Sequence, residues 1–116
     1  MRIEERTRDA VTILDLKGKL VLGDGDALLK DKVHSLLHQG RKHILLNLAD
    51  VPYLDSAGIG ELVGTYTAVG RQGGSLRLLN LTKRIHDLLA IAKLLTVFET
   101  FSDEPDAVRS FSSAKV

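Results

Sequence analysis

Hydrophobic residues follow two different spacings along this chain, and the two spacings alternate from one end to the other. Short alternating or continuous apolar runs are typical of strands. Such runs occur at residues 3–8, 11–16, 43–48, 76–81 and 97–99. Elsewhere, apolar residues recur every three or four positions, which is typical of helices with one buried face. These stretches cover residues 29–37, 57–69, 85–92 and 105–111. The pattern predicts the element order β-β-α-β-α-β-α-β-α.

Strands that alternate with helices indicate a mostly parallel sheet with right-handed crossovers. The first two strands have only Arg8–Ala10 between them, so we expect them to pair as a hairpin and to make the sheet mixed. The sequence therefore predicts an α/β fold with a mixed, mostly parallel sheet of about five strands and about four α-helices. We expect one domain over residues 1–116, with its core at about 3–111 and a frayed tail at Ser112–Val116.

The segment Asn47–Leu62 joins a buried strand to a helix through a polar and proline break. Asp55 and Ser56 stand at the start of that helix, where their side-chain oxygens can accept hydrogen bonds from free backbone N–H groups. A capped helix is the simplest interpretation. However, a hydroxyl after a parallel strand lies where open α/β sheets place their sites. A phosphoryl group on Ser56 would also meet the positive end of the helix dipole.

Composition excludes several function classes. Sixteen basic and fifteen acidic residues are scattered along the chain, which argues against a nucleic-acid surface. The chain has no cysteine, so it has no disulfide, thiolate zinc site or cysteine nucleophile. It has no apolar run of the roughly 18 to 20 residues that span a membrane. Its first residues, Met1–Glu5, are too polar to open a signal peptide. These features predict a cytoplasmic protein.

Few residues suggest an active site. His34 and His38 lie one helical turn apart and, with Asp31, could be drawn as a metal site, but a solvated helix face explains them better. A small hydrolase using Ser56 would need a histidine base within reach, and none is evident from the sequence. The glycines around Gly23 do not match a phosphate-binding loop. We predict no catalytic residue and no metal site.

The segment Asp55-Ser56-Ala57-Gly58-Ile59-Gly60 resembles the Asp-Ser-Ser/Thr-Gly-Leu-Gly segment of STAS domains, in particular the anti-sigma factor antagonists of bacteria. The preceding strand ends in Asn-Leu, as it often does in that family, and the likeness in element order runs from about Ile3 to about Phe111. The resemblance implies that the helices lie largely on one face of the sheet. It also implies that Ser56 is a phosphorylation site.

In that family, the unphosphorylated form binds an anti-sigma factor, which then releases its sigma factor. The anti-sigma factor is also an ATP-dependent serine kinase, which phosphorylates the serine and so ends the binding. A metal-dependent serine/threonine phosphatase reverses the modification. The resemblance implies these partners for this chain, together with a regulatory and non-enzymatic role. It implies no cofactor, because the nucleotide and Mg²⁺ belong to the kinase.

We expect the partner-binding surface to surround Ser56 and to include the loop Val21–Asp24, which should lie at the same end of the sheet. The predicted partner-binding residues are Val21, Leu22, Asp24, Leu54, Asp55, Ala57, Gly58, Ile59 and Leu62, with Val63 close by. Some of the apolar members must face the core, and the sequence does not distinguish them.

Two departures from the family pattern affect the choice of partner. Ala57 stands where the family usually has a second hydroxyl residue, which leaves Ser56 alone as the phosphorylation site. The loop that often reads Gly-Glu-Leu/Ile-Asp is Gly18-Lys19-Leu20-Val21 here and is one residue longer. An alternative is therefore a STAS module with another partner, such as a stressosome-like scaffold or the soluble subunit of a lipid-transport ATPase, without a phosphorylation switch.

Overall fold

The computed structural model describes residues 1–113 and contains the predicted succession of strands and helices. The elements are β1 (Arg2–Arg8), β2 (Val11–Lys17), α1 (Asp26–His38), β3 (His43–Asp50), α2 (Ser56–Arg71), β4 (Ser75–Leu79), α3 (Lys83–Ile91), β5 (Thr100–Phe101) and α4 (Glu104–Ser113). The fold predicted from the sequence is confirmed in its element order. Residues 114–116 of the predicted tail lie outside the described residues.

The strands form one sheet in the order β1-β2-β3-β4-β5. β1 pairs antiparallel with β2, whereas β2–β3, β3–β4 and β4–β5 are parallel pairs. The hairpin between β1 and β2 turns at Asp9, which has a φ of 55°. The mixed, mostly parallel sheet is therefore as predicted, with the antiparallel strand at one edge.

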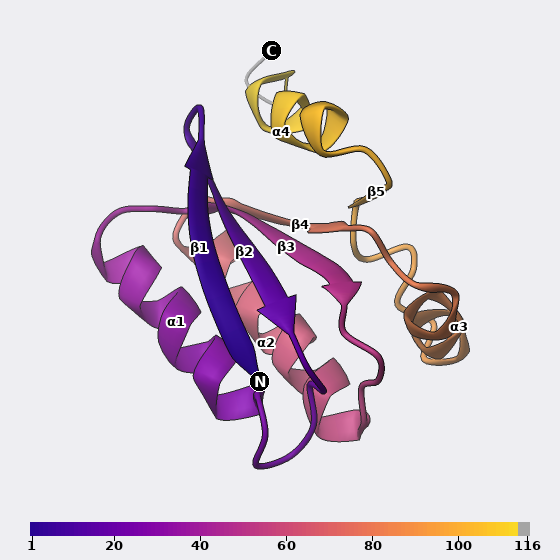
Figure 1. Cartoon of the computed structure of the whole chain (residues 1–116). Helices are drawn as coiled ribbons and strands as arrows, with labels where there is room; N and C mark the ends of the chain where they lie inside the picture. Colours follow the sequence, from indigo (N-terminus) through magenta and orange to yellow (C-terminus); the bar gives the residue numbers. More distant parts are fainter. Residues whose placement is uncertain (114–116) are drawn as a thin grey trace.

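Three helices cover one face of the sheet and the fourth covers part of the other (Figure 1). Alternate residues of each strand point to opposite faces. On the face of α1, α2 and α3, the core contains two leucines from each central strand, among them Leu14, Leu46 and Leu78. Their neighbours Ile13 and Leu45 pack on the other face against α4. The helices lie largely on one face, with α4 as the exception.

The last strand differs from its prediction. The apolar run 97–99 was expected to form it, but β5 lies at Thr100–Phe101. Phe98 is buried in the core instead, where its ring contacts the Tyr66 ring edge-on at 5.2 Å between centroids. The backbone joins the sheet from Glu99 onwards, where the Leu78 N–H donates to the Glu99 carbonyl at 3.0 Å and the Asn80 N–H donates to the Phe101 carbonyl at 2.8 Å. Phe98 therefore packs into the core just before the strand begins.

Candidate functional site

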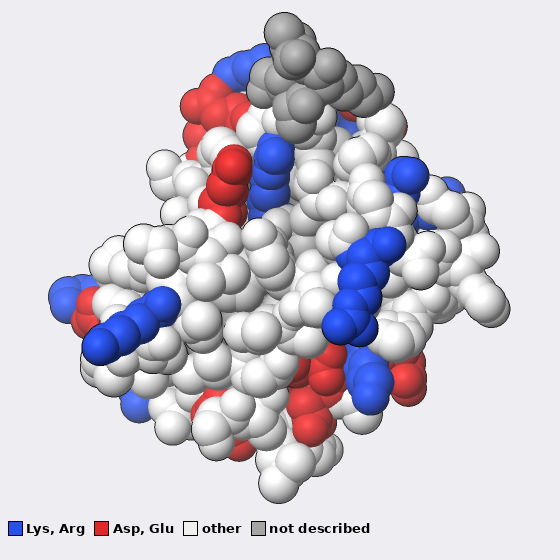
Figure 2. Space-filling view, turned by 180° about the vertical axis from the view of Figure 1, so that it is seen from behind, with Lys and Arg blue, Asp and Glu red and all other residues white. Residues whose placement is uncertain are grey.

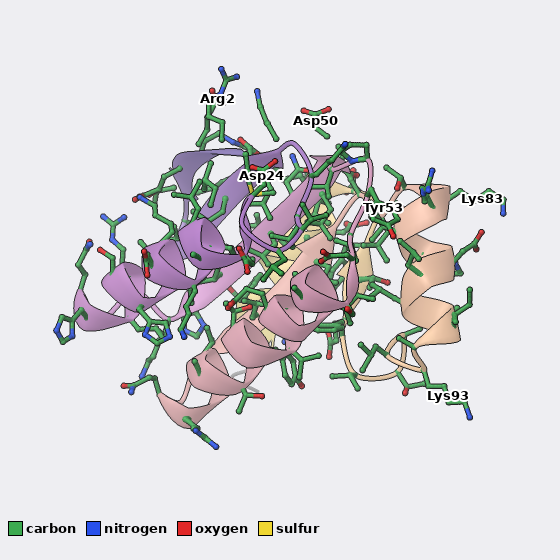
Figure 3. All side chains as sticks on the ribbon, turned by 90° about the horizontal axis from the view of Figure 1, so that it is seen from below. Arg2, Asp24, Asp50, Tyr53, Lys83 and Lys93 are labelled. Atoms are coloured by element: carbon green, nitrogen blue, oxygen red, sulfur yellow. The ribbon has the colours of Figure 1, made fainter. Side chains whose placement is uncertain are left out.

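The connections after β2, β3 and β4 meet at one end of the molecule, because the three strands are parallel. Figure 3 views this end directly and shows Asp24, Asp50 and Tyr53 around it, with Lys83 at the start of α3 to one side. Ser56 follows the connection after β3 and is the first residue of α2. The sequence prediction that the loop 21–24 shares this end with Ser56 is confirmed by the contacts described below.

The Ser56 side chain is exposed to solvent. Among residues 1–113, no hydrogen bond engages its hydroxyl group, so the oxygen is available to a partner. It is the first residue of a 16-residue helix and so lies at the positive end of the helix dipole. The site therefore combines an accessible hydroxyl with a local electrostatic preference for negative charge.

Asp55 is the N-cap of α2, and its carboxylate connects two loops. Its Oδ1 accepts a hydrogen bond from the Gly58 N–H at 2.8 Å, which caps the helix. Its Oδ2 accepts from the Leu22 N–H at 3.0 Å, although Leu22 lies 33 residues earlier in the chain. These two donors, Leu22 first, hold the pKa of the Asp55 carboxyl below its usual range. The sequence left open whether Asp55 caps the helix or orients the Ser56 hydroxyl, and the structure shows the cap.

The loop that carries Leu22 is fixed by its own backbone. Val21 and Asp24 exchange two backbone hydrogen bonds of 3.1 and 2.9 Å, which close a tight turn around Leu22 and Gly23. Just before this turn, the Leu20 N–H donates to the Tyr53 carbonyl at 3.1 Å, and Leu20 forms a parallel bridge with Leu54. The two loops at this end of the sheet are thus joined by main-chain bonds as well as by the Asp55 carboxylate.

The predicted partner-binding residues divide into exposed and buried groups. Leu22 is 75% exposed, and Asp24 is exposed as well. Half-buried positions on the same surface are Val21, Asp55, Ala57, Ile59 and Val63.

Three predicted contact residues lie under that surface instead. Leu54 and Leu62 are 1% and 0% exposed and belong to the core beneath the helices. Gly58 is buried against the backbone of Leu20. In this conformation these three residues lie beneath the surface and support the loops that carry the exposed residues. Their direct contact with a partner stays a prediction.

Tyr53 and Arg84 form a contact that the sequence did not reveal. The Arg84 guanidinium lies 4.9 Å from the centre of the Tyr53 ring, in a cation–π arrangement. The contact ties the loop before Asp55 to the start of α3. No pattern in the sequence indicates it, since 31 positions separate the two residues. It extends the candidate surface from α2 towards the basic start of α3.

Charged and uncharged areas share the face covered by the helices. Figure 2 shows broad uncharged areas on this face, interrupted by a few long basic side chains and by groups of acidic side chains. Glu61 is a half-buried acid on α2, and burial raises the pKa of its carboxyl group.

Three of the four histidines lie on α1 and at the start of β3. His34 and His38 are exposed on α1, and residues 1–113 contain no cluster of three or more His, Asp or Glu side chains placed to hold a metal ion. His43 begins β3, at the opposite end of that strand from Ser56, and packs edge-on against Phe111. None of the described helices has the length and apolar character needed to cross a membrane.

The sequence profile of the STAS domain family matches residues 2–107. The chain belongs to the STAS family. An anti-sigma-B factor antagonist from Listeria monocytogenes is 31% identical to it over 103 residues, which cover 85% of each protein. The resemblance drawn from Asp55–Gly60 is therefore confirmed at the level of the family.

Solved structures agree with this assignment. A protein from Thermotoga maritima, whose proposed role is that of an anti-sigma factor antagonist, superposes with a TM-score of 0.87 at 21% identity, covering 95% of this chain and 94% of that one. The Bacillus cell fate determinant SpoIIAA in its phosphorylated form superposes with a TM-score of 0.73 at 18% identity, covering 94% and 98%. At these identities the superpositions support the fold.

The two departures of this STAS domain from the family pattern have clear places in the structure. Ala57, which replaces the usual second hydroxyl residue, is half-buried beside Ser56. The loop after β2 contains the Val21–Asp24 turn and projects Leu22 into solvent.

Proposed function

We propose that this STAS domain is an anti-sigma factor antagonist switched by phosphorylation of Ser56. In its unphosphorylated form it binds an anti-sigma factor that is also a serine kinase, and so frees a sigma factor in the cytoplasm. The observation that carries the proposal is the exposed Ser56 hydroxyl at the first position of α2, within the Asp-Ser-Ala-Gly-Ile-Gly segment. The anti-sigma-B factor antagonists among its relatives support the same role.

The local electrostatics suit a switch that leaves the fold intact. A phosphoryl group adds roughly two negative charges. At Ser56 these charges stand at the positive end of the α2 dipole, which favours an anion. The helix is therefore expected to tolerate the modification.

The same charges are costly in a complex. Binding removes water from the centre of an interface, and a buried charge without a partner costs several kcal/mol. A loss of about 4 kcal/mol corresponds to roughly a thousandfold in affinity. Phosphorylation thus ends the complex without unfolding the domain.

The chain itself supplies no chemistry in this scheme. The kinase brings ATP and Mg²⁺, and a serine/threonine phosphatase restores the hydroxyl. The domain contributes an accessible nucleophile and a binding surface around it. We accordingly assign no catalytic residue and no cofactor to the chain.

Intact-mass spectrometry tests the proposal. The chain is incubated with candidate anti-sigma kinases from the same genome, ATP and Mg²⁺, and one added phosphate is expected. Ser56→Ala should stay unmodified. Ser102→Ala is a matched control, since Ser102 is also exposed at a helix start, and it should still gain the phosphate.

The complex should be lost in parallel with the mass change. Stable binding to a candidate without any phosphate transfer would contradict the switch. That result would favour the alternative function, a STAS scaffold or a subunit of a transport ATPase without a phosphorylation switch.

A further inference from the structure

Leu22 has an unusual combination of exposure and order. Its side chain is 75% exposed, although leucine is a residue that folding normally buries. Its backbone is nevertheless fixed, because the Val21–Asp24 turn is closed by two hydrogen bonds and the Leu22 N–H donates to Asp55. The Gly23 N–H also donates to the Asp26 carboxylate at 3.0 Å. The chain therefore holds an apolar side chain outward on a rigid turn.

The Asp55 carboxylate determines where this turn lies relative to Ser56. One oxygen is held by α2 through Gly58, and the other holds Leu22. Because Asp55 directly precedes Ser56, the same carboxylate fixes the helix start and the neighbouring turn. Other bonds between the loops, such as that from Leu20 to Tyr53, lie below the turn and do not reach its tip.

We propose that Asp55 is a positioning residue that holds Leu22 next to Ser56, and that Leu22 is the apolar anchor which enters a nonpolar pocket of the kinase that recognises Ser56. The inference rests on the proposed function, because that kinase is the partner. Leu22 lies next to Ser56, so a kinase that reaches the Ser56 hydroxyl would also meet Leu22. This proximity favours the kinase over other partners. An ordered anchor loses little conformational entropy on binding, which favours a fixed turn over a mobile one.

The isolated protein tests the positioning role without any partner. Hydrogen exchange should show a protected Leu22 amide in the wild type. Asp55→Asn keeps a good N-cap but has only one side-chain oxygen, which cannot serve both donors as the carboxylate does. The Leu22 amide should then exchange faster, while the Gly23 amide, held by Asp26, stays protected. Equal protection of Leu22 in both proteins would overturn the tether.

Binding to the kinase tests the anchor. Leu22→Ala should weaken binding by about tenfold or more, as expected for the loss of a buried leucine side chain. Ile91→Ala is the matched control, because Ile91 is 80% exposed on α3 and should change nothing. In phosphorylation kinetics, Leu22→Ala should raise the KM for this chain and leave kcat unchanged. Unchanged binding by Leu22→Ala would overturn the anchor.

A double-mutant cycle links the two roles. If Asp55 acts through Leu22, the protein carrying both Asp55→Asn and Leu22→Ala should bind no more weakly than Leu22→Ala alone. Additive losses would show that Asp55 acts independently and would overturn the positioning role. Failure of the proposed function has a different signature, since the wild type itself would then show neither binding nor phosphate transfer.

Discussion

Gly58 and Leu20 are in such close contact that a Cβ atom at Gly58 would lie 1.9 Å from the Leu20 carbonyl oxygen. The contact joins the first turn of α2 to the backbone that follows β2. It explains why a glycine stands at this position, although glycine weakens a helix. The close approach brings the two loops together at the end of the sheet where Ser56 lies.

Gly58→Ala should therefore destabilise the domain. The added methyl group meets a backbone carbonyl rather than a flexible side chain, so one of the two loops must move. Overpacking of this kind costs about 1–3 kcal/mol or more. Urea unfolding followed by circular dichroism measures the change.

Gly60→Ala is the matched control. A Cβ at Gly60 would meet no atom within 4 Å, and the residue lies in the same helix. This substitution should raise stability by about 0.5–1 kcal/mol, because alanine is a better helix former. Equal effects of the two substitutions would show that the contact with Leu20 does not restrict Gly58.

Ser56→Asp should abolish partner binding while the domain stays folded. The new carboxylate stands at the positive end of α2, so the free energy of unfolding should stay within about 1 kcal/mol of wild type. A thermal melt measures the fold, and co-purification with the kinase measures the complex. Ser56→Ala, which adds no charge, should keep the complex. Retention of the complex by Ser56→Asp would show that charge at this position does not control binding.

Asp15→Asn should destabilise the sheet on the face of α4. The Asp15 carboxylate accepts from the Arg6 Nε at 2.6 Å and from the Asn47 side chain at 2.8 Å. Removing its charge should cost about 1–2 kcal/mol at pH 7, since Asp15 is half-buried and part of the gain is screened by water.

The effect of Asp15→Asn should depend on pH. The Arg6 guanidinium, with help from Asn47, holds the pKa of the Asp15 carboxyl below its usual range. The wild-type advantage is therefore complete above the ordinary aspartate pKa of about 4 and is lost as the pH falls through the lowered value. Urea unfolding of both proteins at pH 7 and pH 3 measures it. An advantage of the same size at both pH values would show that the carboxylate charge is not its source.

The sequence predicted the local features of this fold and few of the contacts between distant segments. The cap at Asp55 was evident, because capping depends on residues only three positions apart. The end of β4 was not. The strand stops at Leu79 because Asn80 has a φ of 59°, a backbone conformation that its residue type permits but does not dictate.

In the candidate site, too, the local features were predicted and the contacts between distant segments were not. Ser56 and its neighbours were found from one short segment. The hydrogen bond from Leu22 to Asp55 and the burial of Leu62 depend on how two loops and a helix pack. An amphipathic pattern shows that a helix has a buried face, but it does not fix which residues at the edge of that face stay accessible.

Glu61→Gln should stabilise the domain at neutral pH. Burial raises the pKa of the Glu61 carboxyl, and the nearby acids Asp26 and Asp31 add to this effect, whereas Lys30 and His34 oppose it. A raised pKa means that the folded state disfavours the ionised form. The cost is present above the raised pKa and disappears as the pH falls below the ordinary glutamate value of about 4.3.

Thermal melts at two pH values measure this effect. Glu61→Gln should melt at a higher temperature than wild type at pH 7, and the difference should shrink at pH 4, where the wild-type carboxyl becomes protonated. Asp50→Asn is a suitable control, because Asp50 is exposed at the end of β3 and its substitution should leave the difference near zero at both pH values (Figure 3). A gain for Glu61→Gln that is equal at pH 7 and pH 4 would show that ionisation of Glu61 is not its cause. Glu61 lies on α2 only five residues after Ser56. A confirmed gain in stability would therefore show that the wild-type residue lowers the stability of the domain close to the proposed binding surface.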